Sequence, residues 1–283
     1  MDLILVTGAA GKTGQAVIRH LVARRLSIRA LVYRADQAAL YEHSAGVQTM
    51  VGALEDPAAM ARAMGGVRSV YFICPNMHPD EYELATSTIE LAQNSGVERF
   101  VYHSVLLPAV EEMPHHWQKH LVEQALGASG LDHTILQPCA YMQNLLAQRW
   151  KIQKDREFEV PYSLDAQMSL VDLEDVAEAA AIVLSMDGHA GATYELCGPE
   201  ALSQQDVAEV LTQHKGFRVG ARWVSPTEWE LSARTELSAY AIDSLLKMFA
   251  YYDKRGFRGD AEPLGRLLNR PPSSLAGFVS RYS

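Results

Sequence analysis

The chain has 283 residues, of which 48% are hydrophobic and 21% charged, a balance typical of a globular protein that buries a substantial core. Its formal net charge of −9 disfavours nucleic acid as the main partner, because binding to phosphates requires a basic surface. No apolar run reaches the length of a membrane span and no signal-peptide pattern opens the chain, so we expect a cytoplasmic protein with no membrane contact.

Short apolar runs alternate with longer helical patterns through the first half of the chain. The runs are rich in β-branched and aromatic residues, which favour strands, and they occupy residues 3–7, 28–33, 47–51, 70–74, 99–104 and 133–138. Helical patterns lie between them, at residues 13–24, 57–64, 80–95 and 116–128. This alternation predicts an α/β fold with a doubly wound parallel sheet that is covered on both faces.

The second half of the chain has a different character. Residues 171–186 predict a helix, with Asp172 as its N-cap and Asp175 near its first turn, and residues 192–197 predict one more strand. Ser203, followed three residues later by Asp206, marks the start of another helix. The remaining sequence is mostly helical with proline and glycine breaks, so we expect a smaller, mostly helical C-terminal lobe.

The stretch VTGAAGKTGQAV connects the first predicted strand to the first predicted helix. Gly8 permits a tight turn, Gly11 lets the backbone approach a pyrophosphate, and Gly14 lets the helix pack closely on the sheet. Phosphates bind at such helix N-termini, because free N–H groups and the helix dipole favour anions. An ordinary glycine-rich turn is the alternative, but the position directly after the first strand favours a dinucleotide-binding site.

The glycine spacing G-x-x-G-x-x-G, with Thr7 before it, resembles that of the short-chain dehydrogenase/reductase superfamily. Further stretches occur in the order seen in its atypical, NmrA-like branch: VYFICPN, GVERFVYHSV, HWQKHLVEQALGASGLDHTILQPCAYMQN, SLVDLEDVAEAA, ATYELCGPEALSQQDVAEVL and LLNRPPSSLAGFV. The resemblance covers nearly the whole chain. It implies a dinucleotide-binding Rossmann domain formed by residues 1–140 and 168–198, and a small substrate-side lobe formed by residues 141–167 and 199–283.

The resemblance also implies an NAD(P) site and the activity of an NAD(P)H-dependent oxidoreductase. The branch includes members that bind the nucleotide as redox sensors without known turnover. A non-catalytic NAD(P)-sensing regulator that binds a protein partner is therefore the alternative function.

Residues at the carboxyl ends of the strands are expected to hold the cofactor, because ligands of open α/β sheets bind there. Arg34 follows the second strand, and a guanidinium suits a 2′-phosphate by bidentate contact, with Lys12 adding charge beside it. We therefore expect NADP in preference to NAD, although both cations are also compatible with a solvated surface. Gly52-Ala53 stands where the family often has Gly-Asp, which removes one adenine contact. The expected cofactor-binding set is Thr7, Gly8, Gly11, Lys12, Thr13, Gly14, Arg34, Pro75, Asn76, Lys119 and Pro138.

The stretch PHHWQKHLVEQ, residues 114–124, carries the expected catalytic positions. Related reductases use Tyr-x-x-x-Lys, a spacing that places both side chains on one helix face. Lys119 matches the family lysine, and His115 stands in place of the tyrosine. An imidazole is a stronger acid than a phenol, so His115 is the expected proton donor. Ser104 ends the preceding strand, where its hydroxyl is expected to bond an oxyanion.

Other histidines and the cysteines raise the question of a metal site. His116 and His120 are four residues apart, but zinc needs three or four ligands and no third one is evident, so we expect no metal, and a solvated helix surface is the alternative for both histidines. Cys74, Cys139 and Cys197 are widely spaced in apolar sequence, which favours buried free thiols over a disulfide framework or a zinc site.

Aromatic and apolar residues are expected near the nicotinamide, beside which Pro138 is expected to lie. Trp117 belongs to the stretch 114–124, and Tyr141, Met142 and Asn144 follow Pro138 in the chain. If these residues line a pocket, the small-molecule substrate is flat and apolar or conjugated, such as a quinone, an enone, an imine or an azo compound. The other interpretation is that they form the core of the small lobe. A homo-oligomer is compatible with the sequence.

Overall fold

The computed structural model describes residues 2–282, which form two compact units. The first unit comprises the residues up to Pro108, Gln118–Gln137 and Val176–Tyr194, and the second comprises Ala109–Trp117, Pro138–Asp175 and the residues from Glu195 onward. Each unit is therefore built from segments that are distant in the sequence. No helix among residues 2–282 is long and apolar enough to cross a membrane.

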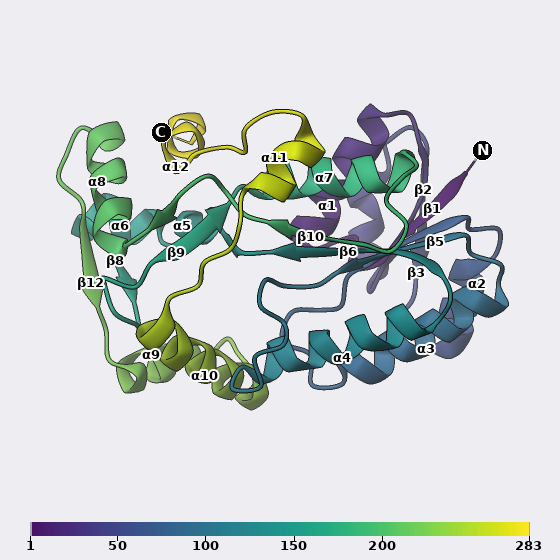
Figure 1. Ribbon diagram of the computed structural model, residues 1–283, viewed down its shortest axis with the longest axis horizontal. Coiled ribbons are helices and arrows are strands. Elements are labelled where there is room, and N and C mark those ends of the chain that lie inside the picture. The colour runs from purple at the N-terminus through teal and green to yellow at the C-terminus, as the bar shows by residue number, and fades with distance from the viewer. Residues whose placement is uncertain (1, 283) are drawn as a thin grey trace. The chain divides into compact units, whose positions relative to one another are not determined.

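A seven-stranded sheet forms the centre of the first unit, in the order β10-β6-β5-β4-β1-β2-β3 (Figure 1). β1 pairs in parallel with β2 and with β4, and parallel pairing continues to β3 on one side and through β5 to β6 on the other. Leu5, Val70 and Phe100 are fully buried, as expected for a sheet covered on both faces. The strands are β1 (Leu3–Val6), β2 (Ser27–Val32), β3 (Val47–Val51), β4 (Ser69–Phe72), β5 (Arg99–His103), β6 (Asp132–Pro138) and β10 (Ala192–Leu196).

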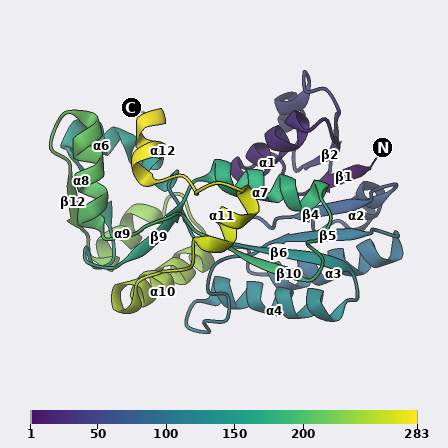
Figure 2. The same cartoon turned by 45° about the horizontal axis from the view of Figure 1, so that its top comes forward.

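Helices cover both faces of this sheet. α1 (Lys12–Ala23) and α7 (Leu173–Ser185) lie on one face, and α2 (Pro57–Met64), α3 (Glu81–Asn94) and α4 (Pro114–Ala128) lie on the other (Figure 2). The connection between β2 and β3 is instead a 3-10 helix, η1 (Ala35–Tyr41). The doubly wound α/β fold predicted from the sequence is confirmed.

The second unit combines helices with two small sheets. One sheet contains β7 (Ala140–Tyr141), β9 (Met168–Val171) and β11 (Ala201–Leu202), and the other contains β8 (Glu157–Val160) and β12 (Gly220–Trp223). These strands were not predicted, because segments of two to four residues are too short to show a readable alternation. The helices are α5 (Asn144–Ala147), α6 (Arg149–Asp155), α8 (Gln204–Lys215), α9 (Pro226–Ala233), α10 (Ala239–Arg255), α11 (Glu262–Leu268) and α12 (Leu275–Arg281).

The boundaries between the units differ from the expected ones, because residues 109–117, 138–140, 168–175 and 195–198 belong to the second unit rather than to the expected dinucleotide-binding domain. β9 pairs with β7 and with β11, so this strand belongs to the second unit rather than to the dinucleotide-binding domain. The predicted start of α8 is confirmed. The Ser203 hydroxyl accepts from the Asp206 N–H at 3.1 Å, and the Asp206 carboxylate accepts from the Ser203 N–H at 2.8 Å.

Two buried aspartates at the start of α7 bind the end of the chain. Asp175 accepts hydrogen bonds from Arg270 Nη2 at 2.8 Å and from the Ser273 N–H at 2.6 Å. Asp172 forms an ion pair with Arg281 and also accepts from the Glu174 N–H. The aspartates that mark the start of this helix in the sequence therefore also fix α11 and α12 within the second unit.

Candidate functional site

The loop between β1 and α1 needs its glycines for different reasons. Gly8 has a φ of +56°, and a Cβ built on it would lie 2.6 Å from Ile73 Cγ2. A Cβ on Gly14 would lie 2.8 Å from Ala9 Cα, so α1 packs directly on the loop backbone. Gly11 is exposed at the N-cap of α1, and its Cβ would meet only the Gly8 carbonyl oxygen, at 3.2 Å. Internal packing therefore restricts position 11 less than positions 8 and 14, and the exposed side of the loop at Gly11 is open to a ligand.

The carbonyl oxygens of this loop accept hydrogen bonds from within the protein. One of the donors is the Tyr41 hydroxyl, which bonds Ala9 O. Burial raises the pKa of Tyr41 to about 12, so this hydroxyl stays protonated and remains a donor. The N-cap of α1 offers no side chain to its first N–H groups. With its carbonyl oxygens already bonded, the loop presents N–H groups to an anion, which is the arrangement that binds phosphates. The pairs are Gly8 O with the Gly11 N–H at 2.9 Å, Ala9 O with the Tyr41 hydroxyl at 2.6 Å, and Ala10 O with Gln15 Nε2 at 2.7 Å.

The remaining residues expected at this edge differ in exposure. Thr7 is fully buried, and its hydroxyl donates to Ile73 O at 2.9 Å and accepts from the Ile73 N–H at 2.8 Å. Thr7 therefore joins β1 to the chain after β4 and does not face solvent. Lys12 is exposed and Thr13 is half-buried in the first turn of α1. Pro75 and Asn76, which follow β4 and were expected to bind the cofactor, are also exposed.

Arg34 lies just past β2, at the N-cap of η1. Its Nε and Nη2 donate to the two carboxylate oxygens of Asp36, at 3.0 and 3.2 Å. This contact raises the pKa of the guanidinium and lowers the pKa of the Asp36 carboxyl. The segment adjoins the glycine loop, because the Ala9 N–H donates to Leu31 O at 3.3 Å in addition to the Tyr41 contact. Arg34 was expected at this site from the sequence, whereas Asp36 was not.

Lys119 lies in a buried polar cluster of the first unit. Its Nζ donates to Glu81 Oε1 at 2.6 Å and to the backbone oxygen of His103 at 3.1 Å. Tyr102 also donates to Glu81 Oε1, at 2.9 Å, and burial raises the pKa of this tyrosine well above its usual value. The side chains of Lys119 and Glu81 are 7% and 0% exposed, so both charges are almost completely desolvated. Sequence analysis did not identify Glu81 or Tyr102, and no local motif marks them.

Ser104 follows β5 and is also buried. Its hydroxyl donates to Glu123, and Gln137 Nε2 donates to both oxygens of the same carboxylate, at 2.9 and 3.0 Å. Burial raises the pKa of Glu123, against the opposing effect of these hydrogen bonds. The Ser104 proton is therefore directed to Glu123, a residue one helical turn after Lys119 in α4 that the sequence analysis did not assign to the site.

His103, which precedes Ser104 at the end of β5, is a buried histidine in the first unit. Its Nδ1 lies 2.6 Å from the Tyr71 hydroxyl. Burial, together with the nearby charge of Lys119, lowers the pKa of His103 to about 3. The ring is therefore neutral near pH 7.

The histidines at the start of α4 are not on a solvated helix face. His115 and His116 are 6% and 0% exposed, and His116 packs its ring edge-on against Phe257 at a centroid distance of 5.7 Å. His120 is half-buried and lies 3.1 Å from Gln124. Within residues 2–282, no three histidine, cysteine or acidic side chains gather as they would around a metal ion. The cysteines are buried free thiols, as predicted.

The expected substrate residues do not share one environment. Met142 is 1% exposed and belongs to the apolar core of the second unit, together with Phe158. Asn144 is exposed at the start of α5, whereas Trp117 and Tyr141 are half-buried. Pro138 is buried at the end of β6. The core interpretation therefore describes Met142, and the other residues retain some accessible surface.

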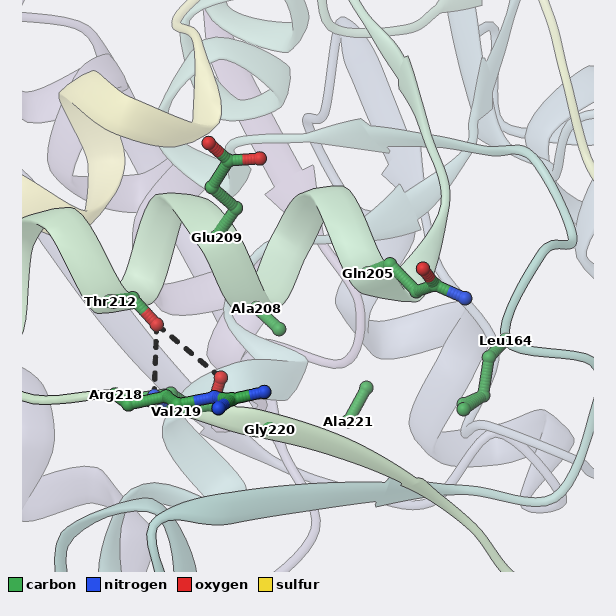
Figure 3. Close-up of a pocket in the computed structure, with 9 residues that line it drawn as sticks. All are labelled: Leu164, Gln205, Ala208, Glu209, Thr212, Arg218, Val219, Gly220 and Ala221. Atoms are coloured by element: carbon green, nitrogen blue, oxygen red, sulfur yellow. Dashed lines mark hydrogen bonds between the residues drawn. The ribbon is translucent and has the colours of Figure 1, made fainter.

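A hollow of about 560 Å³ lies in the second unit between α8 and β12 (Figure 3). It contains none of the expected cofactor or substrate residues. Thr212 on its wall accepts from the Val219 N–H at 2.9 Å and donates to Val219 O at 3.3 Å, so these polar groups already satisfy one another. The lining residues are Leu164, Gln205, Ala208, Glu209, Thr212, Arg218, Val219, Gly220 and Ala221.

Comparison with known proteins gives consistent matches over almost the whole chain. The model of the NmrA-like family matches residues 1–266. The NAD(P)H azoreductase of Xenophilus azovorans is 31% identical, over 99% of this chain and 98% of that protein. The crystal structure of an NADPH-dependent quinone oxidoreductase from Escherichia coli, complexed with NADPH, is 26% identical and covers 99% of both chains with a TM-score of 0.87. The negative transcriptional regulator NmrA in complex with NAD has a TM-score of 0.81 at 17% identity, which shows a common fold alone.

Proposed function

The chain belongs to the NmrA-like family, and from this membership we propose that it is an NAD(P)H-dependent reductase that prefers NADPH and reduces a small, flat, conjugated acceptor. Two similarities support the proposal: 31% identity to an NAD(P)H azoreductase and 26% identity to a quinone oxidoreductase, each over nearly the full length. Azo compounds and quinones are both planar and electron-poor. An enone or an imine has the same requirement for a hydride at one end of a conjugated system.

The geometry of the glycine loop carries the cofactor assignment. The loop carbonyl oxygens are bonded inward, and Gly11 leaves open the side on which a pyrophosphate would lie against the first turn of α1. Lys12 and Thr13 stand in that turn, where an ammonium and a hydroxyl add donors for the same phosphates. Gly8 and Gly14 keep the loop in this conformation. When bound, the reduced cofactor supplies the hydride.

The other residues of the proposed site act on parts of the cofactor at the carboxyl edge of the sheet. Arg34 would bind the 2′-phosphate of NADPH, Pro75 and Asn76 would hold the ribose, and Pro138 would hold the nicotinamide. Lys119 has three N–H donors, of which Glu81 and the His103 carbonyl take two, so one remains for a ribose hydroxyl.

His115 and Ser104 complete the proposed catalytic group. His115 is four residues before Lys119 on α4, and its imidazole supplies the proton that the reduced acceptor takes up. The Ser104 hydroxyl, which donates a hydrogen bond to Glu123 in this structure, would turn to stabilise a developing oxyanion. A conjugated acceptor spreads the developing charge, so it needs less help from an acid than a simple ketone. Trp117, Tyr141 and Asn144 are proposed to contact the acceptor, with Met142 supporting them from the core.

The test is to follow oxidation of NADPH in the presence of a quinone, an azo dye, an enone and an imine, together with a titration of NADPH in the absence of acceptor. We expect binding and turnover with at least one acceptor. A protein that binds NADPH but oxidises it with none of the four would favour the nucleotide-sensing regulator. Failure to bind either nicotinamide cofactor would reject both functions.

A further inference from the structure

We propose that Asp36 sets the balance between the two nicotinamide cofactors, by accepting the ribose 2′-hydroxyl of NADH and by weakening the hold of Arg34 on the 2′-phosphate of NADPH. The inference rests on the proposed function, since it requires a dinucleotide at the glycine loop. It makes a single Arg–Asp pair responsible for reading both cofactors.

The first observation is how the two side chains meet. Arg34 uses Nε and Nη2 on one edge of its guanidinium to bind both oxygens of Asp36, at 3.0 and 3.2 Å. A guanidinium has five N–H groups in one plane, so the edge formed by Nη1 and Nη2 stays available to a second oxyanion. The carboxylate of Asp36 interacts with Arg34 and with the backbone N–H groups of Asp36 and Gln37, and more than half of its surface is exposed. Each side chain therefore remains accessible to a ligand while it holds the other in place.

The second observation is where the pair lies. Dinucleotide-binding folds place the adenosine ribose at the end of the second strand, and an acid there accepts the 2′-hydroxyl of NAD. Arg34 and Asp36 follow β2 directly, and Gln37 fixes the turn by accepting from the Arg34 N–H at 3.0 Å. Tyr41, at the other end of η1, donates to the glycine loop at Ala9 O. The segment is thus attached to the loop that would hold the pyrophosphate.

The third observation is the charge. The side chains are 61% and 69% exposed and form an ion pair, so the approaching 2′-phosphate meets a pair with no net charge rather than an isolated cation. The phosphate contacts the guanidinium directly, but the carboxylate repels it from only a few ångströms further away. For charges at such distances in water, this repulsion changes a binding constant by roughly threefold to tenfold, and it weakens as salt is added.

The proposal predicts opposite responses of the two cofactors to Asp36→Asn. The amide keeps the size of the side chain but removes its charge, so the affinity for NADPH should increase by about threefold to tenfold at low ionic strength. The affinity for NADH should stay the same or fall, because the 2′-hydroxyl loses a charged acceptor. Arg34→Ala should do the reverse and lower NADPH affinity by roughly tenfold or more, with little change for NADH.

The experiment is a calorimetric titration of NADPH and NADH into the parent protein and into Asp36→Asn, Arg34→Ala and Glu42→Gln, each at low and at physiological salt. Glu42 is the matched control, because it is an exposed carboxylate at the other end of η1. We expect the ratio of the NADH to the NADPH dissociation constant to rise at least threefold in Asp36→Asn, more at low salt, and to stay unchanged in Glu42→Gln.

The outcomes separate this inference from the proposed function. If the parent protein binds both cofactors and Asp36→Asn leaves their ratio unchanged, Asp36 does not select between them and the inference alone is overturned. A loss of NADPH affinity in Asp36→Asn would also overturn it, since Asp36 would then serve only to orient Arg34. If the parent binds neither cofactor, the proposed function fails first and the inference fails with it.

Discussion

Replacing Lys119 by methionine would remove the cation that lies 2.6 Å from the buried carboxylate of Glu81. Methionine keeps most of the apolar stem, so the change acts mainly on charge and hydrogen bonding. Since the Glu81 side chain is 0% exposed, its carboxylate would remain in the interior without this partner. Breaking such a buried pair on one side costs about 3–5 kcal/mol, a large part of the roughly 5–15 kcal/mol that stabilises a typical domain.

A second substitution separates the loss of the pair from the loss of packing. Glu81→Gln combined with Lys119→Met leaves no buried charge, and the glutamine can still accept from Tyr102. We therefore expect the free energy of unfolding of the double variant to be only about 1–2 kcal/mol below that of the parent. Urea unfolding, followed by tryptophan fluorescence, measures Lys119→Met, Glu81→Gln and the double variant, and the non-additivity of their effects gives the coupling between Lys119 and Glu81. A Lys119→Met variant that loses less than about 1 kcal/mol, or strictly additive effects, would refute this reasoning.

The same variants test whether Lys119 also binds the cofactor. If its remaining N–H contacts a ribose hydroxyl, the double variant should be folded but still bind NADPH more weakly than the parent. Unchanged NADPH affinity in the stable double variant would leave Lys119 with a structural role only.

Gly11→Val should abolish NADPH binding and leave the fold intact. Gly14→Ala should lower the thermal unfolding midpoint, because its Cβ would lie 2.8 Å from Ala9 Cα. Titration with NADPH and thermal unfolding of both variants distinguish the two roles. His103 has a folded-state pKa of about 3 against about 6.5 when unfolded, so it contributes stability above pH 6.5 that is lost as the pH falls toward 3. At pH 5 this loss is about 2 kcal/mol, so His103→Gln should flatten the decline in stability between pH 6.5 and 5 while the exposed His43→Gln should not; parallel curves for both would contradict this. Asp175→Asn should lower the free energy of unfolding by about 1–3 kcal/mol and increase proteolysis around Arg270 and Ser273. A cleavage pattern equal to that of the parent would count against the role of Asp175 in holding these residues.

The sequence was most informative where structure follows from local patterns. The central strands have near-continuous apolar runs, such as those around Leu5 and Val70, because both faces of the sheet are covered. The glycine loop was recognisable because turn, phosphate approach and helix packing each require a glycine at a fixed spacing. The start of α8 was recognisable because Ser203 and Asp206 cap each other within one turn.

The features that were missed depend on contacts between distant residues. Glu81 is 38 residues away from Lys119, and only the packing of α3 beside α4 brings their side chains together. The small sheets of the second unit pair strands from separate segments, so neither strand of a pair is identifiable alone. A solvated helix face was the alternative left open for His116, yet its ring is buried against Phe257, 141 positions further along by residue number.

The contacts of Asp172 and Asp175 have a consequence for the order in which the protein is completed during translation. Their partners Arg281 and Arg270 are 109 and 95 residues further along, so these contacts cannot form until the ribosome has synthesised both arginines. The sheet edge at β6 likewise waits for β10, which begins only at Ala192. Domains generally fold in the order of synthesis, and this chain instead interleaves its two units. A nascent chain therefore carries an uncovered edge at β6 until β10 has emerged, and an unfinished second unit until Arg270 and Arg281 have emerged, a period in which chaperones can bind it.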